Sequence, residues 1–117
     1  MNQFNSKAAG GTTFSILIAL SIAHLLNDTL QSVISAIYPL LKDSLSLSFA
    51  QIGLITLVYQ ISASVFQPVV GIYLDKKPNP WFLPIGMSFT LAGLLFLAFA
   101  TTLPQVFLSV FLVGVGS

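Results

Sequence analysis

The sequence predicts an all-α integral membrane protein with three complete transmembrane helices and part of a fourth. Of its 117 residues, 56% are hydrophobic and only 6% are charged, whereas a soluble domain averages about 25% charged residues. The apolar residues fall in long runs, and a helix needs roughly 20 such residues to cross the hydrocarbon core of a bilayer. We therefore expect the lipid bilayer to be the first partner of this chain.

The first apolar run extends from about residue 14 to residue 41 and follows a short polar tail that contains Lys7. As a helix it would be about 42 Å long, which is enough to span a bilayer with tilt. Pro39 and the pair Lys42–Asp43 mark its exit. A secretory signal peptide cleaved after Ala23 is an alternative for this start, but the apolar character continues well beyond that residue.

The second run opens with Ser48, followed three residues later by Gln51, which is a capping-box pattern for the start of a helix. No charge occurs from residue 49 to residue 74, and the polar turn DKKPNP follows. Pro104 suits the first turn of the last run. The expected segments are a cytoplasmic tail (1–13), three spans (14–41, 49–74 and 81–103), a cytoplasmic loop (75–80) and the start of a fourth span (104–117).

The lysines predict how the chain is oriented. Lys7 precedes the first span, and Lys76 and Lys77 lie between the second and third spans. Only Lys42 lies between the first and second spans. Because cytoplasmic loops carry the excess of basic residues, we expect the amino terminus and the loop at 75–80 to face the cytoplasm.

A polar stripe interrupts the first apolar run. On a helix, residues three and four apart share a face, so the polar side chains of this run fall on one side. Asp28 lies at the centre of the run, where ionisable residues usually mark a proton, ion or substrate site. The alternative is that Asp28 stays neutral and only hydrogen-bonds neighbouring helices. The members of the stripe are His24, Asn27, Asp28, Gln31, Ser35 and Tyr38.

Two further faces have a recognisable pattern. The second span has polar or small residues spaced along one side, which favours an aqueous cavity shared with the first span; interhelical hydrogen bonding is the alternative. The third span has a stripe of small residues that predicts close helix packing, as does the stretch 114–117. The second-span face comprises Thr56, Gln60, Ala63 and Gln67, with Tyr59 beside it, and the small-residue stripe comprises Gly86, Thr90 and Gly93.

The stretch GIYLDKKPNPW, residues 71–81, resembles the G-x-x-x-D-[RK] core of the loop signature of the major facilitator superfamily, which lies between its second and third helices. The resemblance implies that Gly71, Asp75 and Lys76 serve a cytoplasmic gate. Gly71 would allow close helix approach, and Asp75 would lie near the start of a helix, where negative charge is favoured. The chain departs from the signature with Pro78 in place of a second glycine and with Asn79 and Pro80 in place of basic residues. A plain cytoplasmic turn is the alternative.

Three longer stretches resemble the fosmidomycin-resistance-type drug efflux proteins of that superfamily. They are HLLNDTLQSVISAIYPLL, LSFAQIGLITLVYQ and FQPVVGIYLDKKPNPWFLPIGM, and the resemblance covers about residues 22–117. It implies an inner-membrane antiporter that expels a small drug against inward proton flow, with twelve helices in two halves around a midplane cavity. The chain would supply the amino-terminal three-and-a-half transmembrane helices of a major facilitator fold. Either a fragment or a truncated reading frame would account for its length, and the remaining helices of the full-length transporter would be its partner.

The transport hypothesis assigns roles to particular side chains. Asp28 would carry the proton and His24 would tune it, while four further residues would line the substrate cavity. The competing hypothesis is a small, complete membrane protein that acts as a structural or regulatory subunit. We expect no enzyme, cofactor or metal, because the sequence has no cysteine and no nucleophile–base pair or phosphate loop; four scattered lysines also argue against nucleic-acid binding. The expected cavity residues are Asn27, Gln31, Tyr59 and Gln60.

Overall fold

The structure is a computed structural model that describes the backbone of residues 3–117 and the side chains from residue 11 onward. Its regular elements are helices, with no strand among the described residues, which confirms the all-α prediction. The helices are α1 (Gln3–Ala36), α2 (Tyr38–Ser44), α3 (Phe49–Lys76), α4 (Phe82–Ala98) and α5 (Leu103–Gly116).

The first apolar run forms two helices instead of one. Helix α1 begins at Gln3, well before the expected residue 14, and residues 3–13 contain no proline that would interrupt it; residues 1 and 2 of the expected tail lie outside the described part. Pro39 lies in the first turn of α2 and has no N–H to continue the ladder. The bond from the Ile37 N–H to the Val33 carbonyl (3.0 Å) still links the two helices, so their axes nearly continue.

Helix α3 begins with the capping box that the sequence predicts. The Gln51 side-chain oxygen accepts from the Ser48 N–H (2.8 Å), and the Ser48 hydroxyl accepts from the Gln51 N–H (3.2 Å). The helix then passes through Pro68 and ends at Lys76. A second capping box, between Thr102 and Gln105, starts α5. Helix α4 is shorter than expected and ends at Ala98, because residues 99–102 form the connection to that cap.

Small residues let α5 pack closely on both α3 and α4. A Cβ added at Gly93 would lie 2.6 Å from the Val113 Cγ2 atom and 2.7 Å from the Ser109 carbonyl oxygen. A Cβ added at Gly114 would lie 2.8 Å from the Tyr59 carbonyl oxygen. Such distances leave no room for a side chain, so the predicted close-packing role of these small residues is confirmed.

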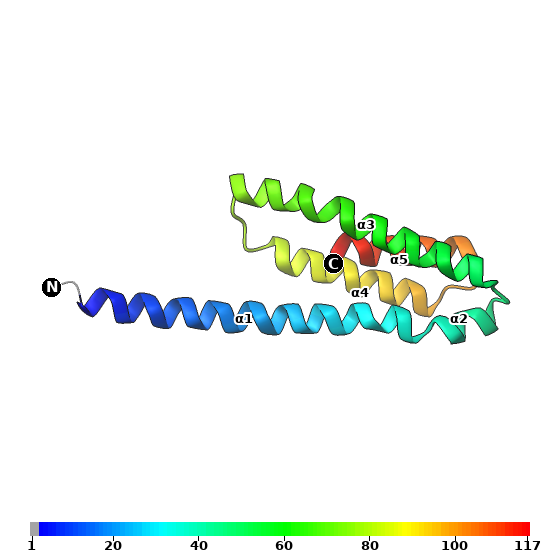
Figure 1. Cartoon of the computed structure of the whole chain (residues 1–117), viewed down its shortest axis with the longest axis horizontal. Coiled ribbons are helices and arrows are strands. Elements are labelled where there is room, and N and C mark those ends of the chain that lie inside the picture. Colours follow the sequence, from blue (N-terminus) through cyan, green and yellow to red (C-terminus); the bar gives the residue numbers. More distant parts are fainter. Residues whose placement is uncertain (1–2) are drawn as a thin grey trace.

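The helices converge at one end of the molecule and diverge at the other. Figure 1 shows α1 lying along α4, while α3 approaches α1 near α2 and moves away from it toward Lys76. The buried apolar residues join the helices mainly at the α2 end, so the other end is left open. These residues are Ile34, Leu41, Leu47, Ile55, Leu97, Val106, Val110 and Val113.

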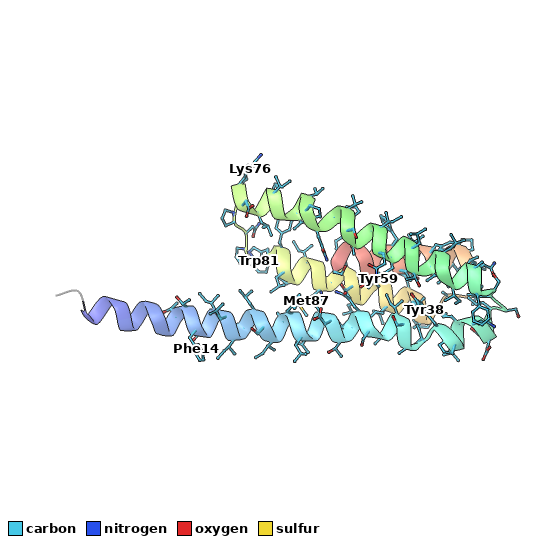
Figure 2. The ribbon with its side chains drawn as sticks, in the orientation of Figure 1. Phe14, Tyr38, Tyr59, Lys76, Trp81 and Met87 are labelled. Carbon is cyan, nitrogen blue, oxygen red and sulfur yellow. The ribbon has the colours of Figure 1, made fainter. Side chains whose placement is uncertain are left out.

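The outer surface of the bundle is apolar. Two helical stretches, Gly11–Ser44 and Phe49–Lys76, are long and apolar enough to cross a membrane, and α4 and α5 are shorter apolar helices. In Figure 2 the side chain of Phe14 points away from the other helices, and it is 65% exposed. None of the apolar window within Gly11–Ser44 is buried by the rest of the described chain. A surface of this kind suits a lipid environment.

Candidate functional site

The polar stripe of α1 has two edges with different surroundings. Successive residues on an α-helix are about 100° apart, so Asp28 lies about 40° from His24 in one direction and Asn27 about 60° from it in the other. The edge that carries Asn27 and Gln31 faces the other helices, and Tyr38 of α2 continues it. The edge that carries His24 and Asp28 is exposed.

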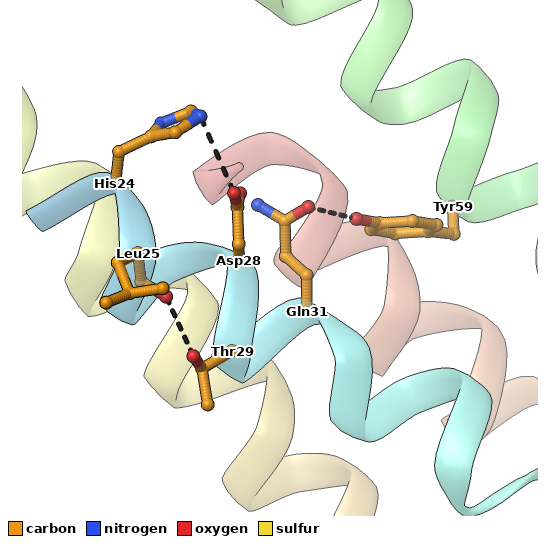
Figure 3. A network of polar contacts seen from close by, with 6 residues as sticks. All are labelled: His24, Leu25, Asp28, Thr29, Gln31 and Tyr59. Carbon is orange, nitrogen blue, oxygen red and sulfur yellow. Dashed lines mark hydrogen bonds and ion pairs between the residues drawn. The ribbon is translucent and has the colours of Figure 1, made fainter. Parts of the chain in front are cut away.

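The inner edge is hydrogen-bonded to α3 and α4. The Tyr59 hydroxyl donates to the Gln31 side-chain oxygen at 2.5 Å, and Figure 3 shows the tyrosine reaching across from α3 to α1. The Thr56 hydroxyl donates to the Tyr38 hydroxyl at 2.9 Å.

A third contact ties the same edge to α4. The Thr90 hydroxyl lies 3.5 Å from the Asn27 side-chain oxygen, which makes it the longest and weakest of the three contacts. Thr90 itself is fully buried. Interhelical hydrogen bonding, the alternative to a cavity role, is therefore the role of three residues of this edge: Asn27, Gln31 and Tyr38.

The outer edge presents an exposed ion pair. The His24 Nε2 atom lies 3.6 Å from the Asp28 Oδ2 atom, one helical turn away, and their side chains are 78% and 58% exposed. In Figure 3 Asp28 lies between His24 and Gln31. A shallow cavity of about 590 Å³ opens over it. Its lining residues are Leu17, Leu20, Ser21, Ala23, His24, Leu25, Asn27, Asp28 and Leu83.

A larger cavity of about 780 Å³ lies at the diverging end, between α1, α3, α4 and α5. Its wall is mostly apolar and includes Phe66, Phe82 and Phe89. Two polar residues of the stripe, His24 and Asn27, border it. His24 and Asn27 thus border both cavities, whereas Asp28 borders only the shallow one.

The predicted cavity residues do not all meet. Tyr59 and Gln31 contact each other, but Gln60 is exposed and borders neither cavity. The reason is geometric, since Gln60 follows Tyr59 directly and therefore points about 100° away from it. Gln67, which the sequence places on the same face of α3 as Gln60, does border the larger cavity. The sequence assigns Thr90 only to helix packing; its hydroxyl, placed between Gly86 and Gly93, is the signal for the polar contact with Asn27.

The residues expected to serve a cytoplasmic gate differ in two ways from the local structure that the sequence predicts. Asp75 lies in the last turn of α3 and not near the start of a helix, so the helix dipole does not favour its charge; Lys76, in the same turn, is well placed. No described atom lies within 4 Å of a Cβ added at Gly71, so this glycine permits no close approach within the described chain. Gly71 instead borders the larger cavity.

Electrostatics at the site depend on few groups. His24–Asp28 is the ion pair that the described residues form. The same residues contain no group of three or more His, Cys, Asp or Glu side chains that could hold a metal ion. The imidazole and carboxylate of this pair can exchange protons and form hydrogen bonds.

Comparison with known proteins gives consistent relatives. The chain is 58% identical over 112 residues to the fosmidomycin resistance protein of Escherichia coli (strain K12), which covers 96% of this chain and 28% of that protein. It is 46% identical over 108 residues to the uncharacterized MFS-type transporter YfnC of Bacillus subtilis (strain 168), which covers 92% of this chain and 26% of the relative. The chain thus spans about a quarter of the length of these relatives. No solved structure gives a significant match.

The family comparison covers most of the chain. The family model of the Major Facilitator Superfamily matches residues 20–117. Those residues include the polar stripe of α1, the α3–α4 connection and the small-residue contacts of α5. The chain therefore belongs to the major facilitator superfamily, whose members are membrane transport proteins built from helices.

Proposed function

We propose that this chain is part of a proton-coupled secondary transporter that exports a small drug across the inner membrane. The observation that carries the proposal is the exposed His24–Asp28 pair near the middle of an apolar helix. A carboxylate at the bilayer centre costs about 2.5–3.5 kcal/mol on insertion scales, so such residues face a cavity or another protein segment and not lipid. The face of α1 that carries this pair is accordingly the wall of a translocation path.

Asp28 is the proton carrier in this proposal, and His24 tunes it from one turn away. Protonation of Asp28 and occupancy by the drug stabilise different conformations of the transporter, and that difference couples the two movements. The name of the E. coli relative points to fosmidomycin-like compounds as the drug. Because the chain spans about a quarter of its relatives, the rest of the path comes from further transmembrane helices.

The Asp28→Asn variant tests the proposal. Asparagine keeps the size and hydrogen-bonding ability of the side chain but cannot titrate. In vesicles that contain the transporter, we expect drug addition to drive proton movement with the parent and not with Asp28→Asn. The matched control is Asp43→Asn, which removes an exposed carboxylate in α2, away from both cavities.

Three results would be informative at matched expression. Loss of proton movement in Asp28→Asn alone supports a carrier role. Parent-like proton movement in Asp28→Asn makes Asp28 structural and overturns the proposal. Equal loss in both variants would point to a general effect of charge removal, and that result also counts against a specific role for Asp28.

A further inference from the structure

We propose that Tyr59 and Thr56 are positioning residues that set the rotation of α1 about its axis and thereby aim Asp28 into the translocation path. The inference rests on the proposed function for what Asp28 does there. The orientation itself is argued from the contacts of α1 and can be tested without transport.

Among the described side chains of α1, Ile34 is the one that is buried in the core, so apolar packing favours one face of α1 only near its carboxyl-terminal end. None of its apolar window is buried by the described chain, and exposed apolar side chains occur on several sides of it, including Leu20, Ile22 and Leu26. Since lipid is as apolar as a leucine side chain, a rotation that exchanges one leucine for another changes little in free energy. Hydrophobic burial at Ile34 therefore leaves much of the rotation of α1 to be fixed by polar contacts.

The interhelical hydrogen bonds supply that constraint. Gln31–Tyr59 (2.5 Å) and Tyr38–Thr56 (2.9 Å) lie about two turns apart along α1 and α2 and pull the same edge toward α3. Two bonds on one edge resist rotation in both directions. With that edge held against α3, Asp28 lies about 60° round the helix from Gln31, where its side chain is exposed and borders the shallow cavity.

The bonds also make the orientation adjustable. Side-chain hydrogen bonds between membrane helices are individually weak, so losing one changes the balance of orientations by about threefold and losing both by about tenfold. A mostly lipid-exposed helix held in this way can turn when the bonds exchange partners. The hydroxyl groups of Tyr59 and Thr56 thus connect the packing of α3 with the direction in which Asp28 faces.

Cysteine labelling tests the orientation directly, because these 117 residues contain no cysteine; any cysteine elsewhere in the whole protein is replaced by serine first. Ser21→Cys places a thiol in the lining of the shallow cavity. Ile22→Cys, the matched control, places it about 100° further round, on an exposed apolar side. A hydrophilic methanethiosulfonate reagent, applied to open membranes containing the whole protein, should label the cysteine at 21 much faster than the one at 22.

The ratio of the two labelling rates is the readout. Tyr59→Phe and Thr56→Val each remove a hydroxyl with little change in size, and we expect the ratio to fall about threefold in each and about tenfold in the double variant. Thr56→Ser keeps the hydroxyl and should restore the parent ratio. A mere loosening of the bundle would raise both rates together, and that result overturns the inference.

The single variants decide the matter if the double variant does not fold. A parent-like ratio in folded Tyr59→Phe and Thr56→Val overturns the positioning role. The labelling experiment does not depend on proton movement. A failure of Asp28→Asn to alter coupling would therefore leave its result unaffected, and the two ideas fail separately.

Discussion

Gly93 lets the backbone of α4 lie directly against α5. Any larger residue at this position would collide with α5. Val113 and the carbonyl of Ser109 occupy the space that a Cβ would need. In a membrane, where lipid tails are as apolar as side chains, such close contacts supply much of the attraction between helices. Polar side chains on α1 complement this packing by adding directional contacts to α3 and α4.

Gly93→Ala should weaken the α4–α5 contact. Inserting a methyl group into a tightly packed site costs about 1–3 kcal/mol, so the midpoint of unfolding by sodium dodecyl sulfate in mild micelles should fall. The matched control is Gly53→Ala, because no atom lies within 4 Å of a Cβ added there. The control should be unchanged or up to about 1 kcal/mol more stable, since alanine favours a helix. Equal midpoints for the two variants would contradict the close-packing account.

Helix ends can be predicted from the sequence where a local residue pattern defines them. Ser48 and Gln51 identify the start of α3 because a capping box needs only residues three apart. Thr102 and Gln105 form the same pattern before α5, beside Pro104 in the first turn. The sequence does not predict the break at Ile37 or the start of α1 at Gln3, because an apolar run does not define where a helix begins or ends.

Ser48→Ala should destabilise the start of α3. Loss of an N-cap side chain costs about 1 kcal/mol, and we expect a matching fall in the unfolding midpoint in micelles. Ser48→Asp, which can still accept the hydrogen bond from the Gln51 N–H, should retain most of the stability. If the Asp variant loses as much stability as the Ala variant, the side-chain cap is not what stabilises this end.

At the scale of the whole molecule, composition was enough for the fold class and insufficient for the site. Scarce charge and long apolar runs predicted the helical membrane fold, and the polar residues of α1 were correctly expected on one stripe. Which edge of the stripe is covered depends on partners such as Tyr59 and Thr90, which lie 28 and 63 residues away from their contacts. No local periodicity encodes that choice, so the adjacent residues Asn27 and Asp28 have different surroundings: Asn27 contacts Thr90 and borders both cavities, whereas Asp28 is exposed and borders only the shallow one.

The lysine distribution predicts the topology of the whole chain, with the α3–α4 connection in the cytoplasm. In intact cells, Asn79→Cys should resist an impermeant thiol reagent, whereas Ser44→Cys, in α2 at the opposite end, should react. Both positions are exposed, so burial cannot explain a difference. Permeabilised cells provide the control, since both thiols should then react. The reverse pattern in intact cells would invert the orientation.

The uneven packing of the helices has a consequence for biosynthesis. Helix α1 leaves the ribosome first, yet most of the contacts in the bundle join α5 to α3 and α4. The order of synthesis is therefore opposite to the order in which contacts become available. Until α3 and α4 are synthesised, the nascent α1 holds an aspartate and a histidine within the bilayer. Tyr59 and Thr90, which form hydrogen bonds with α1 in the folded bundle, do not yet exist at that point. That interval is when the membrane insertion machinery has to shelter these polar groups from lipid.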